Sequence, residues 1–234
     1  MRPSLPPDML RLVEAASVHV AFDGWSDATL AAAAADCGMD LATARALAPR
    51  GGVDLAAAAH KLGDDAFRAA FAQEDLDGLR LREKIALAMR LRLAAAGDRD
   101  GVRAATTLFA LPHHAAQGAA LIWGTADAIW TAVGDTATDG NYYSKRATLS
   151  AIWGAVVLYW LGDESEGYAD THAFIDRRIG DVMAFEGAKA KLRASPVLGP
   201  LTAPLGRFIA AIKAPAARDD LPGQWRDPKD DRPA

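Results

Sequence analysis

Cysteine is almost absent from this chain of 234 residues, and Cys37 is its single example. One thiol excludes an internal disulfide and a cysteine-rich zinc site, so the sequence predicts a reducing compartment. Strand signals are equally scarce, because no segment alternates apolar and polar residues over the length of a strand. Hydrophobic residues make up 51% of the sequence, and alanine and leucine are prominent among them. This composition predicts an all-α protein.

The signatures of catalysis are also missing. The sequence has no glycine-rich phosphate-binding loop, no His-Glu-x-x-His zinc motif and no nucleophile elbow. A di-iron bundle needs Glu-x-x-His pairs, but the third residue after Glu166 is Ala169. His113 and His114 are adjacent and therefore point about 100° apart on a helix. We expect no enzyme activity, no cofactor and no metal site.

Long uncharged apolar runs are absent too. No window reaches the roughly 20 apolar residues that cross a bilayer. The first ten residues, MRPSLPPDML, have the pattern of neither a secretion signal nor a transit peptide. We therefore expect a soluble or peripheral protein of a bacterial-type cytoplasm.

Helix signals follow one another along the chain. Asp8, Ser26, Asp40 and Asp54 are predicted to open three short helices and a longer one, which is the spacing of a helix-turn-helix protein. Longer helical patterns follow near Leu76–Ala96, Asp98–Ala110, His114–Val133, Asn141–Leu161 and Glu166–Leu192. We expect four parts: a helix-turn-helix-like bundle in residues 1–52, a helical ligand-binding domain in 53–193, an amphipathic C-terminal helix in 194–213 and a disordered tail in 214–234.

The N-terminal pattern LVEAA…F…GW…ATL…AAA…GM…ATARAL resembles the start of TetR-family regulators, so DNA binding is one hypothesis. The charge argues against it. Residues 1–60 carry four basic and seven acidic groups, a net charge of −3, whereas a DNA reader brings lysine and arginine to the phosphates. The third helix offers Thr43 and Arg45 among small apolar side chains, which is little with which to read bases. The sequence therefore does not favour nucleic-acid binding.

A polar island, DTATDGNYYSKRATL, separates two strongly apolar helical segments. One interpretation is a turn at Gly134 and Gly140, followed by a helix cap at Asp139 or Asn141. The other is a protein-binding surface, because aromatic and cationic side chains are typical of binding hot spots. The residue pattern alone leaves both open.

The order of several motifs resembles a known family. TADAIW, GDTATDGNYYSKRATL, LYWLGDESEG and FIDRRIGDVMAFE occur in that order, with FDGWSDATL, PRGGVDLAAA and LREKIALAMRLRL before them. Together they resemble the ubiquinone-biosynthesis accessory family called coenzyme Q protein nine. The resemblance implies a TetR-like fold, a homodimer, a bound isoprenoid lipid and a partner, the di-iron demethoxyubiquinone hydroxylase.

The resemblance also implies a surface for that hydroxylase in the polar island. Two departures reduce its apolar area: the family more often has a tryptophan in place of Tyr142 and a large aromatic residue in place of Gly140. The implied partner-binding residues are Asp139, Asn141, Tyr142, Tyr143, Lys145 and Arg146.

A lipid carrier needs an apolar cavity, and several helices have wide apolar faces. Such residues line a cavity in one interpretation and form an ordinary core in the other, because periodicity does not distinguish them. The candidate lipid-binding residues are Leu87, Leu91, Leu108, Leu121, Trp123, Ile129, Trp130, Ile152, Trp153, Val156 and Trp160.

The C-terminal part is locally basic. From Gly187 to Lys213 there is no acidic residue, and five lysines and arginines give a charge of +5, although the whole chain has −4. A cationic amphipathic helix suits an anionic membrane surface; the alternative is a last helix that packs on the domain or at a dimer contact. The predicted membrane-binding residues are Leu198, Leu201, Leu205, Arg207, Phe208, Ile209, Ile212 and Lys213.

The combined hypothesis is a non-catalytic carrier that binds a polyprenyl quinone precursor and presents it to the hydroxylase. We expect it on the inner face of a bacterial cytoplasmic membrane. The alternative is a TetR-family, ligand-responsive transcriptional repressor, in which the same pocket controls DNA affinity.

Overall fold

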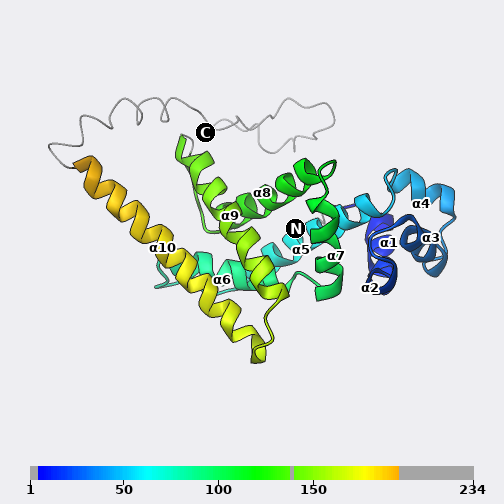
Figure 1. Ribbon diagram of the computed structural model, residues 1–234, viewed down its shortest axis with the longest axis horizontal. Coiled ribbons are helices and arrows are strands. Elements are labelled where there is room, and N and C mark those ends of the chain that lie inside the picture. Colours follow the sequence, from blue (N-terminus) through cyan, green and yellow to red (C-terminus); the bar gives the residue numbers. More distant parts are fainter. Residues whose placement is uncertain (1–4, 138–139, 195–234) are drawn as a thin grey trace, which may run out of the picture.

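The computed structural model describes residues 5–137 and 140–194, without the side chains of residue 140 and residues 183–194. Every regular element in this part of the chain is helical, which confirms the predicted all-α class. Figure 1 shows a small group of helices, α1 to α4, at one end of the molecule and the long helix α10 at the other.

The small group is built around buried aliphatic side chains. It contains α1 (Pro7–Ser17), α2 (Val20–Asp23), α3 (Asp27–Asp36) and α4 (Leu41–Leu47). Leu12 of α1 and Leu30 of α3 are fully buried against Leu55 of the next helix, α5 (Gly52–Phe71). Helix α5 therefore belongs to both cores, since its later residues Phe67 and Phe71 lie in the larger one.

The predicted helix starts hold at Ser26 and Asp40 and fail at Asp8 and Asp54. Asp8 lies inside α1, whose N-cap is Pro6. Ser26 accepts a hydrogen bond from the Thr29 amide at 3.2 Å, and Asp40 accepts one from the Thr43 amide at 2.9 Å. Asp54, however, does not cap α5, which begins two residues earlier at Gly52. Its carboxylate instead accepts a hydrogen bond from the Arg50 amide at 2.8 Å. The described part also contains a fourth short helix, α2, where the sequence predicts three.

The larger group contains α6 (Leu81–Ala94), α7 (Arg99–Ala110), α8 (Ala115–Ala132), α9 (Gly140–Leu161) and α10 (Ala169–Ala194). Helix α9 packs on both α8 and α10, and α10 also packs on α6. The predicted helix from Glu166 is interrupted: a 3₁₀ turn, Glu166–Tyr168, precedes α10, and Gly167 and Tyr168 have positive φ. None of the helices in the described ranges is long and apolar enough to cross a membrane.

The end of α9 is held by hydrogen bonds to its last carbonyl groups. Arg99 of α7 donates to the carbonyls of Trp160 and Leu161 at 2.9 and 2.8 Å, and Arg103 donates to Leu161 at 3.1 Å. Cations at a helix C-terminus also complement its dipole. Asp163 then accepts hydrogen bonds from the hydroxyls of Ser165 and Thr171 and from the amides of the same two residues, which lowers the pKa of its carboxyl. These contacts fix where α9 stops and α10 begins.

The N-terminal group approaches the rest of the chain closely at Gly52. A Cβ atom on this residue would lie 2.2 Å from the backbone carbon of Trp25, at the junction of α2 and α3. We expect Gly52→Ala to lower the free energy of unfolding by about 3 kcal/mol, because backbone atoms have to move apart. Thermal and urea unfolding of the purified variant measure this.

Gly124→Ala is the matched control. Nothing lies within 4 Å of a Cβ atom at Gly124, which is inside α8. Alanine is the better helix former, so this change should stabilise the protein by about 0.5–1 kcal/mol. Equal stability of the two variants would contradict the close approach at Gly52.

Candidate functional site

A cavity of about 520 Å³ lies between the N-terminal group and the larger group of helices. Side chains of α1, α2, α5, α6, α7, α8 and α9 line it, together with the loops next to these helices. Three tryptophans contribute to the wall: Trp25, Trp153 and Trp160. Its volume falls within the range of about 300–1,000 Å³ that is typical of small-molecule pockets.

Short side chains explain why the cavity exists. Ala56 and Ala59 of α5, Ala105 of α7 and Gly154 of α9 line the wall, and none of them reaches across it. Helices α7 and α8 approach closely at Gly118, where a Cβ atom would lie 2.8 Å from the Cβ atom of Phe109. Alanine and glycine therefore allow these helices to pack closely at some positions and leave space for the cavity at others.

The sequence identified the wall only in part. Of the eleven predicted lipid-binding residues, three line the cavity: Leu121, Trp153 and Trp160. The other eight do not line it; Ile129 and Val156 are buried in the core, Leu87, Leu91, Trp130 and Ile152 pack against that core, and Leu108 and Trp123 are partly buried elsewhere.

The sequence also missed the part of the wall that comes from the N-terminal helices. Val13, Val20 and Trp25 line the cavity, although they precede the predicted ligand-binding domain. Their periodicity is that of the small N-terminal core, so it gave no signal for a second role. The expected wall lay within the later helices, whereas the observed wall joins the two groups of helices.

One polar cluster interrupts the apolar wall. Arg92 of α6 donates from Nε to Asp64 Oδ1 at 2.7 Å and from Nη2 to the His60 carbonyl at 3.0 Å. The Thr125 hydroxyl donates to Asp64 Oδ1 at 2.8 Å, and His60 Nε2 lies 2.9 Å from the same hydroxyl. The cluster thereby connects α5, α6 and α8. His60 and Arg92 are the two members that line the cavity.

His60 is neutral in this setting. Burial disfavours its charged form, and the neighbouring Arg92 cation repels a second positive charge, so the pKa of His60 falls to about 4. Its ring therefore carries one proton at neutral pH. Asp64 neutralises the charge of Arg92, whose side chain is 3% exposed.

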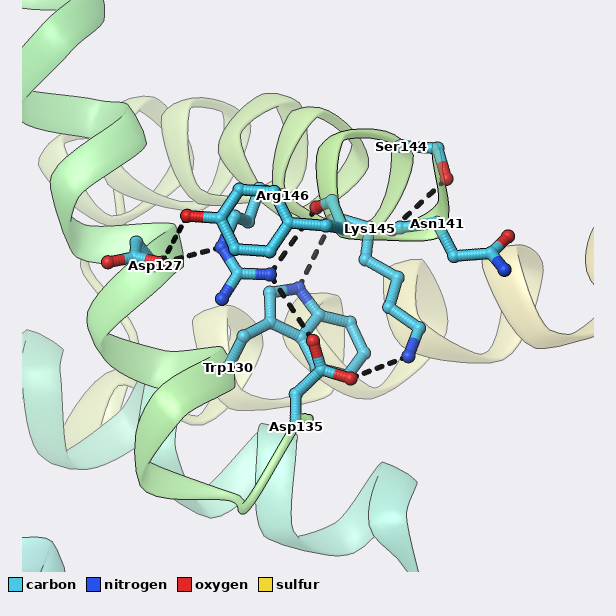
Figure 2. Close-up of polar contacts among 8 residues, drawn as sticks. Asp127, Trp130, Asp135, Asn141, Ser144, Lys145 and Arg146 are labelled. Atoms are coloured by element: carbon cyan, nitrogen blue, oxygen red, sulfur yellow. Dashed lines mark hydrogen bonds and ion pairs between the residues drawn. The ribbon is translucent and has the colours of Figure 1, made fainter. Parts of the chain in front are cut away.

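A second cluster occupies the polar island between α8 and α9. Figure 2 shows the Arg146 guanidinium between two carboxylates, Asp127 and Asp135. Its Nε lies 2.5 Å from Asp127 Oδ1, and its Nη1 lies 3.2 Å from Asp135 Oδ2. Lys145 Nζ also contacts Asp135, at 2.6 Å. These cations lower the pKa of Asp135 against the opposing effect of its burial.

Arg146 is therefore not an exposed residue of a partner surface. Its side chain is 4% exposed, and the guanidinium carbon lies 3.5 Å from the centre of the Tyr142 ring. Tyr142 in turn donates a hydrogen bond to Asp127 at 3.4 Å. Of the positions predicted for partner binding, Arg146, Tyr142 and Tyr143 contact α8, since the Tyr143 ring lies 6.3 Å from that of Trp123, whereas Asn141 is exposed.

Trp130 serves the same junction. Its indole Nε1 donates to the Lys145 carbonyl at 3.1 Å, and Lys145 Nζ lies 5.2 Å from the centre of its ring (Figure 2). Gly134 makes the preceding turn with a φ of +83°, and the Asp135 amide donates to the Trp130 carbonyl at 2.9 Å. The turn interpretation of the island is thus confirmed at Gly134, and a tryptophan expected in a lipid pocket instead stabilises the turn.

Two groups of predicted residues cannot be placed. Asp139 lies outside the described residues, and so do all the predicted membrane-binding positions: Leu198, Leu201, Leu205, Arg207, Phe208, Ile209, Ile212 and Lys213. The tail predicted for residues 214–234 lies outside them as well. In the part of the chain that is described, no group of three or more histidine, cysteine or acidic side chains is placed to hold a metal ion.

The burial of Arg146 generates a stability prediction. Arg146→Ala should lower the free energy of unfolding by about 3 kcal/mol, because it leaves the buried Asp135 carboxylate with one partner fewer. Lys145→Ala removes a half-exposed partner of the same carboxylate and should cost at most about 1 kcal/mol. Urea unfolding of the two variants measures the difference, and equal losses would show that Arg146 is not the central member of the cluster.

Comparison with known proteins finds, within the second half of the chain, the family that the sequence motifs resemble. Residues 115–186 match the family described as COQ9. The probable ubiquinone biosynthesis protein coq9 of Dictyostelium discoideum is 33% identical over 112 residues, which cover 47% of this chain and 36% of that protein. The human ubiquinone biosynthesis protein COQ9 is 34% identical over 79 residues, or 34% of this chain and 25% of that one. The matched region thus spans about a third or less of these relatives.

The fold has a solved counterpart. The crystal structure of a TetR transcriptional regulator from Nitrosomonas europaea superimposes with a TM-score of 0.60 at 22% identity, and the match covers 75% of this chain and 97% of that one. This likeness confirms the predicted TetR-like fold and carries no statement about DNA.

The expected location is wrong. The relatives from Dictyostelium, human, rat and cattle are all named mitochondrial, which contradicts a place on the inner face of a bacterial cytoplasmic membrane. The predicted resemblance is confirmed for residues 115–186: this segment, which contains α8, the polar island, α9 and most of α10, matches COQ9, on a TetR-like fold.

Proposed function

We propose that this protein is a non-catalytic, lipid-binding accessory protein of ubiquinone biosynthesis. In this role it binds a polyprenyl quinone precursor and presents it to the di-iron demethoxyubiquinone hydroxylase. The observation that carries the proposal is the cavity of about 520 Å³ with its largely apolar wall. The names of the COQ9 relatives supply the pathway.

Burial of an isoprenoid tail provides the binding energy. Apolar surface removed from water contributes roughly 25 cal/mol per Å², so a few isoprene units supply several kcal/mol. Trp153 and Trp160 line the cavity but are only 2% and 4% exposed, so most of the apolar surface offered to such a tail comes from the other wall residues. The polar side chains of the wall are few, which suits a guest that is mostly hydrocarbon.

The rival function, a ligand-responsive repressor, has the weaker physical support. The N-terminal sequence carries a net charge of −3 over residues 1–60, so it repels the phosphate backbone that supplies most non-specific DNA affinity. Helix α4 is seven residues long, and its Thr43 hydroxyl is already bound to Asp40 at 2.5 Å. Arg45 is then the main side chain left on α4 to meet DNA.

Two glycines on neighbouring helices offer a matched test of the cavity. Gly154 on α9 lines it, Gly124 on α8 does not, and nothing lies within 4 Å of a Cβ atom built on either. Gly154→Leu should fill part of the cavity and lower the amount of lipid that copurifies, about fivefold if one side chain removes roughly 1 kcal/mol of apolar contact. Organic extraction followed by mass spectrometry of equal protein amounts measures it.

Gly124→Leu controls for the loss of a helical glycine and should retain the wild-type amount of lipid. Thermal melting establishes that both variants are folded. Recovery of no lipid from the wild-type protein would contradict the carrier role, and equal recovery from both variants would place the lipid elsewhere.

The partner surface is tested on α9. We infer that the hydroxylase contacts the island at Asn141, which is exposed, and at the partly buried Tyr143, whose ring packs beside Trp123 of α8 with the ring centres 6.3 Å apart. Tyr143→Ala should weaken copurification of the hydroxylase about tenfold, as is usual for an aromatic hot spot. Tyr159→Ala is the control: it removes another tyrosine, 38% exposed, from the opposite end of the same helix. Undiminished binding by Tyr143→Ala would remove this surface from the proposal.

Contact with an anionic membrane through residues 194–213, and the homodimer, stay predictions from the sequence and the family. They complete the proposed route, in which a lipid passes from a bilayer to the cavity and then to the enzyme.

A further inference from the structure

The volume of the cavity limits the length of lipid tail that it encloses. The cavity measures about 520 Å³, and its wall is largely apolar. In an apolar protein cavity each carbon atom of a guest takes roughly 25 Å³, which is the share of each benzene carbon in a cavity of about 150 Å³. At this share about 20 carbons fill the cavity. An isoprene unit has five carbons, so the capacity is about four units.

The wall favours hydrocarbon contents, because its charged and hydroxyl groups are engaged by the protein itself. Arg92 is paired with Asp64 at 2.7 Å. The Ser17 and Thr106 hydroxyls donate to backbone carbonyls of the preceding turn at 2.7 and 2.8 Å. Asp98 accepts hydrogen bonds from two backbone amides at the start of α7, at 3.0 and 3.2 Å. A prenyl chain, which has no polar atoms, therefore suits this wall.

The wall is not closed on every side. Leu158 of α9 lines the cavity and is 62% exposed to solvent. Ala115 and Ala119 of α8 also line it and are exposed. The cavity therefore reaches the molecular surface beside these two helices. A tail that is longer than the cavity has a way out and does not need to fold back inside.

We propose that the cavity selects prenyl lipids by tail length: it encloses about four isoprene units and leaves the rest of a longer tail outside. The inference rests on the proposed carrier function and adds the tail-length specificity to it. A shorter tail leaves part of the apolar wall uncovered. Further units of a longer tail add no contact with the wall. The protein should therefore discriminate against tails shorter than this limit and bind all longer tails about equally.

Prenyl alcohols of two to six isoprene units test the limit. Each is titrated, below its solubility limit, into full-length protein from which bound lipid has been extracted. The fluorescence of Trp25, Trp153 and Trp160, all in the cavity wall, reports binding. The dissociation constant should fall about five- to tenfold per unit up to four units, because burial of each unit outweighs the cost of ordering it. For five and six units it should stay within about twofold of the four-unit value.

Gly154→Leu should lower the limit by one unit. Gly154 lines the wall, and nothing lies within 4 Å of a Cβ atom placed on it. Leucine adds four carbons, which at the same share take roughly 100 Å³, close to the volume of one isoprene unit. The affinity should then level off at three units. Gly124→Leu is the control outside the wall and should leave the limit at four units. Thermal melting checks the fold of both variants.

The outcomes separate this inference from the carrier role. A dissociation constant that keeps falling at five and six units overturns the limit, and one that rises there shows that a longer tail does not leave the cavity. Both results contradict the inference and leave the carrier role standing. An unchanged limit in Gly154→Leu overturns the inference as well, because the tail would then bind outside the cavity. If none of the probes binds, the carrier role fails together with this inference. The wild-type series decides the matter even if Gly154→Leu does not fold.

Discussion

The buried ion pair between Asp64 and Arg92 is the contact on which the central part of this structure depends. Asp64 lies on α5, Arg92 lies on α6, and the Thr125 hydroxyl of α8 completes the group. A buried carboxylate and guanidinium stabilise a fold only when hydrogen bonds satisfy both groups. Here Asp64 accepts hydrogen bonds from Arg92 and Thr125, and Arg92 also donates to the His60 carbonyl. Gly63 is part of the arrangement, because a Cβ atom on it would lie 2.6 Å from Arg92 Nη1. The three helices are thus held at one spacing beside the cavity.

The same ion pair determines the chemistry of the cavity. It places the Arg92 cation in an apolar wall, and the Asp64 carboxylate neutralises the charge of that cation. Burial is the main cause of the lowered pKa of His60; Arg92 lowers it further, and Asp64 opposes this effect. The result is a neutral ring at one point of a wall that is otherwise mostly apolar. Arg92 also lies 5.5 Å from the centre of the Trp153 ring, so the polar cluster and the aromatic wall are in direct contact.

The sequence predicted the fold better than the site, and the residues show why. Helix starts depend on local signals, so Ser26 and Asp40 could be recognised as caps from their neighbours alone. The wall of a cavity depends on which helices face each other. Ile129 and Val156 have the same periodicity as Trp153, yet they are core residues without a share in the cavity. Val13 and Val20 line it although they belong to the N-terminal helices, and no local pattern announces a contact between distant segments.

Arg146 illustrates a second limit of sequence reasoning. A basic residue next to two tyrosines has the composition of a binding surface, and the family resemblance strengthens that interpretation. Its partners, Asp127 and Asp135, are 19 and 11 residues away in sequence, so the ion pairs become visible only when α8 and α9 are placed side by side. The residue has a structural role at the position where the pattern predicts a functional one.

Helix α9 connects the two candidate sites. It carries Tyr143 and Arg146 near its start and Trp153, Gly154 and Trp160 in the cavity wall further along. Seven residues separate Arg146 from Trp153, which on a helix is about 10 Å along the axis. Contacts fix α9 at both ends: ion pairs to Asp127 and Asp135 at its start, and hydrogen bonds from Arg99 to its last carbonyls. A lipid in the cavity and a protein on the island would therefore contact one rigid element, and the proposed delivery needs no separate structure to bring the two together.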